Sequence, residues 1–142
     1  MIGSFRAFLT DACLDDIVLG SSEEHVRLRI ATDFDIGTVR PFRILQAGDV
    51  QLTFAPTLVQ IRVDLFQHHE PQLVNDVPIG TTVPELSAWL EAQGLAVTWE
   101  SKADWETHGI LTSGVRLIAI DNFVQCALVA TPGLTWRPAA TG

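Results

Sequence analysis

One stretch of the chain, from Ile44 to Phe66, alternates apolar and polar residues twice, and the turn sequences Ala-Gly-Asp and Ala-Pro-Thr interrupt it. Successive side chains of a β-strand point to opposite faces, so a period of two indicates strands with one buried face. The pattern predicts strands near 42–46, 49–54 and 58–66, and the short connections make them antiparallel. The expected buried face comprises Val50, Leu52, Phe54, Ile61, Val63 and Leu65.

Two helix signals precede these strands. Apolar residues recur at three- and four-residue spacing over 5–13, which predicts a helix from about Ser4 to Asp16. Ser21 and Glu24 have the spacing of a capping box and predict the start of a second helix. The segment 26–30 also alternates as a strand would, and we favour the helix because the cap supplies a start signal.

A third helix has the clearest boundaries in the sequence. Thr82 is a suitable N-cap, Pro84 stands at an early helical position and Glu85 completes a capping box. Gly94 is placed to end the helix. We therefore predict a helix from Thr82 to about Gly94.

The remaining chain reads as further strands and connections. Strands are expected at 96–100, 110–111, 115–121 and 123–130, a turn-rich link at 33–41, a loop at 68–80 and a frayed tail at 138–142. No repeat period is visible in the sequence. The order of elements predicts a single α+β domain over residues 1–142, with a mainly antiparallel sheet and helices on one face.

Charge excludes some partners. Acidic residues outnumber basic residues 17 to 9, which gives a formal net charge of -8 and a pI of about 4.7. Such a chain repels phosphate backbones and anionic lipid surfaces, so we expect neither a nucleic acid nor a membrane as partner.

Targeting signals and cysteine usage indicate a compartment. Residues 1–6 lack the apolar core of a signal peptide, and the longest apolar run, near 123–130, is shorter than the ~20 residues of a membrane span. Cys13 and Cys126 are far apart and form no disulfide framework, which is typical of free thiols in a reducing cytosol. We expect a cytoplasmic protein.

The residue types that bind metals cluster at one point, His68, His69 and Glu70. Neighbouring side chains of an extended segment point to opposite faces, so the two histidines are poorly placed to chelate one ion. The sequence also contains no H-E-x-x-H or C-x-x-C motif. We interpret the cluster as part of a solvated loop and expect no metal or other cofactor.

Nucleophilic catalysis would require Cys13 or Cys126 to be activated by a base such as His25 or His108. Cys126 lies in an apolar run, where a thiol usually packs as a small hydrophobic group. Ser113 is not part of a G-x-S-x-G nucleophile elbow and is interpreted as a turn residue. We therefore expect no catalytic residue and no enzymatic activity.

Negative charge is concentrated between residues 64 and 106, which contain eight acidic residues and one basic residue, Lys102. The difference of 8 and 1 is a net -7. Trp105 lies in the polar run 101–108 of this segment, where an exposed, partner-binding position is plausible, whereas Trp89 and Trp99 are expected in the core. The candidate partner-binding residues are Glu100, Asp104, Trp105 and Glu106, and an acidic surface favours a basic partner.

Five segments carry a resemblance to a known class of proteins. They are Ile17–Val26, Ile44–Phe54, Leu58–Val63, Thr82–Leu90 and Leu111–Leu117. Taken in this order they resemble the small bacterial immunity proteins encoded beside polymorphic toxins. The resemblance implies that the protein binds and neutralises a cognate toxin by occluding or distorting it, and that it needs no catalytic residues of its own.

Two other functions stay open. A small-molecule-binding or enzymatic α+β domain would have a pocket between helices and sheet, lined by His25, His108 or carboxylates with shifted pKa values. A structural adaptor would bind another protein that is no toxin. We expect an immunity protein with a basic toxin as its partner.

Overall fold

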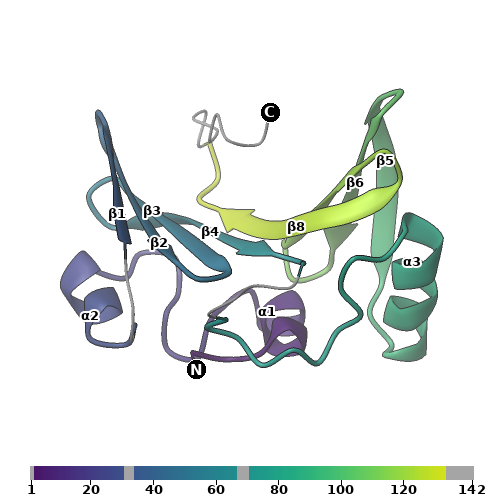
Figure 1. Ribbon diagram of the computed structural model, residues 1–142, viewed down its shortest axis with the longest axis horizontal. Coiled ribbons are helices and arrows are strands. Elements are labelled where there is room, and N and C mark those ends of the chain that lie inside the picture. Colours follow the sequence, from purple (N-terminus) through teal and green to yellow (C-terminus); the bar gives the residue numbers. More distant parts are fainter. Residues whose placement is uncertain (1, 31–33, 67–70, 134–142) are drawn as a thin grey trace.

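The computed structural model describes residues 2–30, 34–66 and 71–133. The helices in these residues are α1 (Phe5–Asp11), α2 (Glu23–Arg27) and α3 (Val83–Ala92). The strands are β1 (Phe34–Val39), β2 (Phe42–Ala47), β3 (Val50–Phe54), β4 (Leu58–Asp64), β5 (Val97–Ala103), β6 (Glu106–Leu111), β7 (Arg116–Ile120) and β8 (Phe123–Ala130). Neighbouring strands pair antiparallel, and the helices lie on one face of the sheet (Figure 1). The predicted α+β class is confirmed.

Two four-stranded meanders build the sheet, in the order β1-β2-β3-β4-β8-β7-β6-β5. α2 precedes the first meander in the chain, and α3 precedes the second. The last strands of the meanders, β4 and β8, pair antiparallel from Gln60 with Ala130 to Asp64 with Cys126. This pairing places the first strand of each meander, β1 and β5, at the two edges. In Figure 1 β1 and the β5–β6 hairpin rise above the central strands at the two ends of the sheet, so the sheet is curved.

The apolar residues predicted to face inward on the central strands are buried, but the expected one-sided burial is not found in β3, where Gln51 and Thr53 are buried as well. Val50, Leu52, Phe54, Ile61, Val63 and Leu65 are each at most 1% exposed. Leu52 stands opposite Leu45 on β2 and Ile61 on β4, so a continuous apolar row crosses three strands on the helix side of the sheet.

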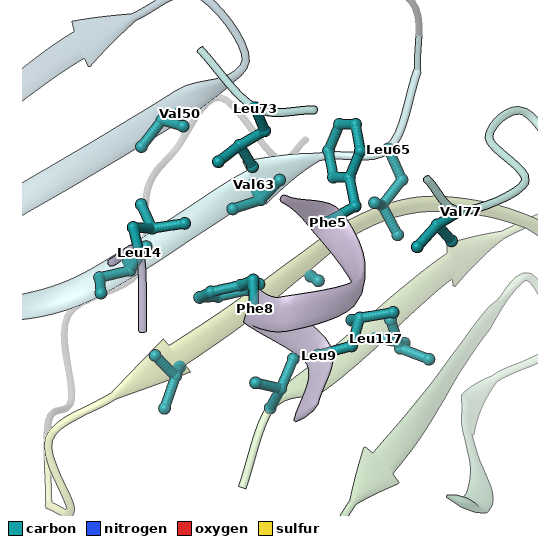
Figure 2. Close-up of a cluster of buried hydrophobic side chains, with 14 of the residues drawn as sticks. Phe5, Phe8, Leu9, Leu14, Val50, Val63, Leu65, Leu73, Val77 and Leu117 are labelled. Carbon is teal, nitrogen blue, oxygen red and sulfur yellow. The ribbon is translucent and has the colours of Figure 1, made fainter. Parts of the chain in front are cut away.

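Helix α1 packs its apolar stripe onto this face. Figure 2 shows its side chains Phe5, Phe8 and Leu9 among Val50, Val63, Leu65, Leu73, Val77 and Leu117. The Oγ of Ser4 accepts a hydrogen bond from the backbone N–H of Ala7 and begins the helix. The helix ends earlier than predicted, at Asp11, because Ala12 adopts the left-handed conformation with φ of 60°.

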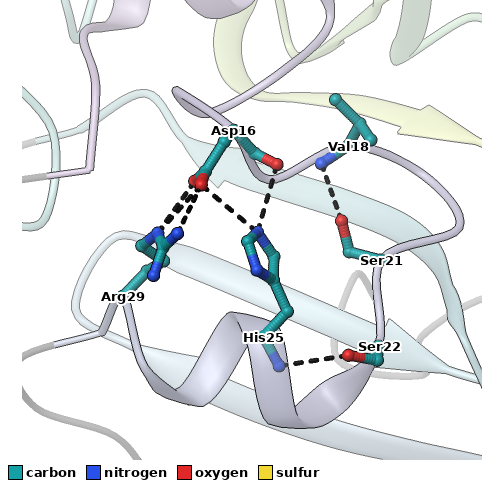
Figure 3. A network of polar contacts seen from close by, with 6 residues as sticks. All are labelled: Asp16, Val18, Ser21, Ser22, His25 and Arg29. Atoms are coloured by element: carbon teal, nitrogen blue, oxygen red, sulfur yellow. Dashed lines mark hydrogen bonds and ion pairs between the residues drawn. The ribbon is translucent and has the colours of Figure 1, made fainter.

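Helix α2 is present and begins one residue later than predicted. Ser22, not Ser21, is the N-cap, and its Oγ accepts the backbone N–H of His25 (Figure 3). The Oγ of Ser21 accepts from the backbone N–H of Val18 instead. The alternative strand at 26–30 is not found, because the helix continues to Arg27.

Two expected boundaries were wrong. The link at 33–41 forms strand β1, which pairs with β2 and has a bulge between Asp35 and Gly37. Gly37 lies at this bulge with a φ of 129°, a conformation that favours glycine. A glycine among turn-forming residues is typical of a turn, although the segment pairs with β2 over most of its length. The polar run 101–108 is largely strand, because it completes β5 and begins β6.

Helix α3 begins as predicted. The Oγ1 of Thr82 accepts from the backbone N–H of Glu85, and the Glu85 carboxylate accepts from the backbone N–H of Thr82, a complete capping box. Trp89 and Trp99 pack against the core but are only partly buried. Trp99 covers Gly109 of β6, where a Cβ atom would lie 2.7 Å from the indole ring.

Candidate functional site

The β5–β6 hairpin contains all four residues predicted to bind a partner. Glu100 is exposed on β5, Asp104 and Trp105 form the turn, and Glu106 begins β6. The Trp105 side chain is 56% exposed. The backbone C=O of Trp105 accepts from the N–H of Asp121, 2.8 Å away, so the neighbouring β7–β8 turn holds this tip in place.

A second exposed aromatic side chain lies at the same end of the sheet. Phe123, the first residue of β8, is 50% exposed. It stands opposite Ile120 of β7, which in turn stands opposite Glu106 of β6. The sequence analysis missed Phe123, because its apolar run suggests a buried strand and only the sheet order shows that its first residue lies beside the hairpin. We name Asp104, Trp105, Glu106 and Phe123 the hairpin surface.

A chain of charged contacts lies behind the hairpin turn. The Lys102 ammonium donates to Glu100, 2.7 Å away, and the Arg116 guanidinium of β7 approaches the same carboxylate at 3.4 Å. Arg116 also donates to Nδ1 of His108 at 2.9 Å, and Nε2 of His108 contacts the Glu106 carboxylate at 2.5 Å. The contacts join three strands and orient two of the four predicted residues.

His108 is neutral in this arrangement. A guanidinium can only donate, so Nδ1 of His108 accepts and carries no proton, while Nε2–H donates to Glu106. The residue is 2% exposed, and this burial lowers the pKa of His108, an effect that Arg116 and Lys102 reinforce and Glu106 opposes. Both ring nitrogens are engaged, so His108 holds the strands together and is not placed to act as a base.

The acidic segment 64–106 does not form one negative surface. Asp64 is paired with Arg62 in β4, Glu85 belongs to the capping box, and the carboxylate of Asp76 accepts the backbone N–H of Arg6. Arg62 contacts Asp64 and Arg116 contacts Glu100, so two arginines from outside the segment balance part of the net -7. Exposed carboxylates stand at the hairpin and on α3, where Glu91 is exposed.

The other residues considered for chemistry are separated. Burial raises the pKa of the Cys126 thiol to about 11 and, with Asp11 and Asp15, raises that of Cys13, so neither thiol is activated. Ser113 donates its hydroxyl to the backbone C=O of Leu9, 2.7 Å away. No three His, Cys, Asp or Glu side chains in the described ranges could hold a metal ion. His68, His69 and Glu70 lie outside the described residues, as does the tail 138–142.

His25 belongs to a different network near α2. The Arg29 guanidinium binds the Asp16 carboxylate, with the shortest contact at 2.6 Å, and Nε2 of His25 lies 3.4 Å from the same carboxylate (Figure 3). The hydrogen bond from Arg29 lowers the pKa of Asp16. These contacts tie the segment before α2 to the helix, and His25 does not meet Cys13, Cys126 or His108 there.

Two shallow hollows open on the described surface. One is lined by α1 and the β6–β7 connection around Leu9, Leu111 and Ser113. The other lies between α3 and β5 and is lined by Ser87, Glu91, Leu95, Ala96, Val97 and Trp99. Buried apolar side chains occupy much of the space between α1 and the sheet, and neither His25 nor His108 lines the hollow between α3 and β5.

Within residues 2–30, 34–66 and 71–133, no helix combines the length and the apolar character needed to cross a bilayer. Comparison with known proteins finds no matching family model, no matching curated protein and no matching solved structure. The class of molecule that the fold defines is therefore an α+β protein with an eight-stranded antiparallel sheet.

Proposed function

We propose that this protein is an immunity protein that binds a cognate bacterial toxin in the cytoplasm and neutralises it by protein–protein occlusion. The observation that supports this most is Trp105, a large aromatic side chain that is 56% exposed on a turn held by a neighbouring turn. Tryptophan is enriched among residues that dominate binding energy, and a preformed turn loses little conformational freedom on binding.

The partner that fits the hairpin surface is a basic protein. Asp104 and Glu106 flank Trp105, and Phe123 extends the apolar contact area at the same end of the sheet. An apolar centre with charged groups beside it is the usual anatomy of a specific interface. A toxin that acts on an anionic substrate would present the complementary basic surface, and no enzymatic activity of this protein is required.

Co-expression with the toxin domain encoded by the adjacent gene tests this function. We expect the protein to restore growth and to co-purify with the toxin, and Trp105→Ala to raise the dissociation constant roughly thirtyfold, the effect of about 2 kcal/mol. Leu28→Ala is the matched control, because Leu28 is 74% exposed on the other side of the fold, at the end of α2. Absence of both growth rescue and co-purification would refute the immunity function.

A further inference from the structure

Strand β5 is an edge strand, and its outward backbone groups can be identified. The backbone N–H of Leu111 in β6 donates to Val115, at the start of the β6–β7 connection. Successive residues of an antiparallel strand direct their N–H and C=O groups to alternate sides. The residues of β6 that bond to β5 are therefore Ile110 and His108, which stand opposite Thr98 and Glu100.

Thr98 and Glu100 therefore direct their backbone N–H and C=O groups toward β6. Their neighbours along β5 direct these groups outward, away from the sheet. The outward residues are Val97, Trp99 and Ser101. A bulge between Ser101 and Ala103 ends this regular edge, and bulges commonly stop strand pairing. The edge thus offers three consecutive outward positions and no more.

A hollow runs beside the same edge. It lies between β5 and α3, which stand next to each other at one end of the sheet (Figure 1), and Leu95, Val97 and Trp99 provide its apolar lining. The indole N–H of Trp99 is buried and has no hydrogen-bond partner among the described residues. Glu91 of α3 supplies a carboxylate at the rim.

We propose that the groove between β5 and α3 binds an extended segment of a partner protein as a ninth, antiparallel or parallel strand of the sheet, with a basic side chain of that segment paired with Glu91. The main-chain groups of the three outward residues provide the ladder, and the hollow accepts alternate apolar side chains. The proposal deepens the proposed function, since the segment would belong to the toxin.

Glu91 favours a basic segment over other occupants. It lies in the last turn of α3, where the helix dipole disfavours a negative charge, so a cation beside it relieves an unfavourable interaction. A basic segment also agrees with the acidic residues of the hairpin, which continues from the same strand. The short edge limits the paired segment to about three to five residues.

A phage-displayed library of random nine-residue peptides provides a probe that does not depend on the toxin. We expect selected peptides to combine alternating apolar residues with Arg or Lys, and to bind Ser101→Pro about tenfold more weakly than the parent protein. Proline removes the outward N–H and keeps the bonds to β6, and it is tolerated on edge strands. Ser101→Ala is the matched control, because it keeps the backbone N–H and removes only the hydroxyl bond to Ala103.

The role of Glu91 is tested by repeating the selection on Glu91→Lys. We expect the selected peptides to change from basic to acidic, while Glu24→Lys, on the exposed face of α2, leaves the preference basic. A lysine at position 91 suits the helix dipole, so lost binding would not reflect a weakened helix.

Amide hydrogen exchange in the peptide complex tests directly whether the peptide pairs with the edge of β5. The amides of Val97, Trp99 and Ser101 should exchange at least about tenfold more slowly with peptide, while those of Thr98 and Glu100, already bonded to β6, change little. The proposal is overturned if no peptide is selected, or if selected peptides bind Ser101→Pro as well as Ser101→Ala. Either outcome leaves growth protection by the protein unaffected, so the two proposals can fail separately.

Discussion

At the scale of single residues, His108 shows how a polar group is accommodated in this sheet. Its ring is almost completely buried, and both nitrogens are occupied, Nδ1 by Arg116 and Nε2 by Glu106. A buried polar group costs stability unless it is hydrogen-bonded, so the three side chains depend on one another. The same bonds hold Glu106 beside Trp105 in the hairpin surface.

The lowered pKa of His108 predicts a pH dependence of stability. In the unfolded chain the imidazole takes up a proton below about pH 6.5, whereas in the folded protein it stays neutral to lower pH. The unfolded state then binds more protons, so the free energy of unfolding should fall as the pH decreases below about 6.5. Urea unfolding at a series of pH values measures this.

The variant His108→Gln should flatten that pH dependence, because it removes the buried imidazole whose pKa is lowered. Equal pH dependence in the His108→Gln variant and the parent protein would contradict the assignment of this titration to His108.

Gly109 gives a second residue-scale prediction. A Cβ at this position would lie 2.7 Å from the Trp99 ring, well inside van der Waals contact. Gly109→Ala should therefore lower the free energy of unfolding by roughly 1–3 kcal/mol, because the ring or the strand must shift. Adding Trp99→Leu should recover part of the loss, and thermal unfolding of the single and double variants tests this coupling.

At the scale of elements, the helices are defined by their first residues. Ser4, Ser22 and Thr82 each accept a backbone N–H three residues later, and each cap begins a helix whose apolar residues face the sheet. α2 has only five residues, so contacts of Asp16 with Arg29 and His25 hold it in place as much as its own hydrogen bonds do.

Removal of the α3 cap should destabilise the protein measurably. Thr82→Ala eliminates the oxygen that accepts from Glu85, and we expect a loss of about 1 kcal/mol in the free energy of unfolding. Thr82→Ser retains the oxygen and should cost much less. If both variants lose the same amount, the methyl group of Thr82 matters and the cap does not.

At the scale of the whole molecule, the fold pairs acidic residues of one segment with basic groups from other segments. The segment 64–106 is strongly acidic, but Arg62 and Arg116, which lie outside it, pair with Asp64 and Glu100, and the backbone N–H of Arg6 donates to the Asp76 carboxylate. The exposed acids of the hairpin and α3 are the ones that an approaching partner meets first. Long-range attraction of a basic toxin should therefore depend on them.

Association with the toxin should slow as salt increases, because a Debye length of about 10 Å at 0.1 M screens exposed charges. Asp104→Lys should reduce the association rate several-fold at low salt, with Glu24→Lys as an exposed control on α2. Reversing the charge of Glu100 or Glu106 is less informative, because Glu100 also contacts Arg116 and Glu106 also contacts His108. A stopped-flow association rate independent of both salt and Asp104 would contradict acidic steering.

The sequence by itself determined the local structure. Alternation defined β3 and β4 and their buried face, and the Thr82 cap defined α3, because both depend only on side-chain direction and on hydrogen bonds between residues close in the chain. The candidate residues at 100–106 were found together for the same reason, since one hairpin contains them. Strand β1 was not predicted, because the glycine at its bulge is also typical of a turn.

Only the tertiary structure decided which strands are edges and which side chains meet across the sheet. β4 pairs with β8 although more than sixty residues separate Asp64 from Cys126, and this one pairing makes β5 an edge beside α3. Such contacts form between distant segments that compete with many other pairings, and no local pattern of residues specifies which pairing buries the most apolar surface.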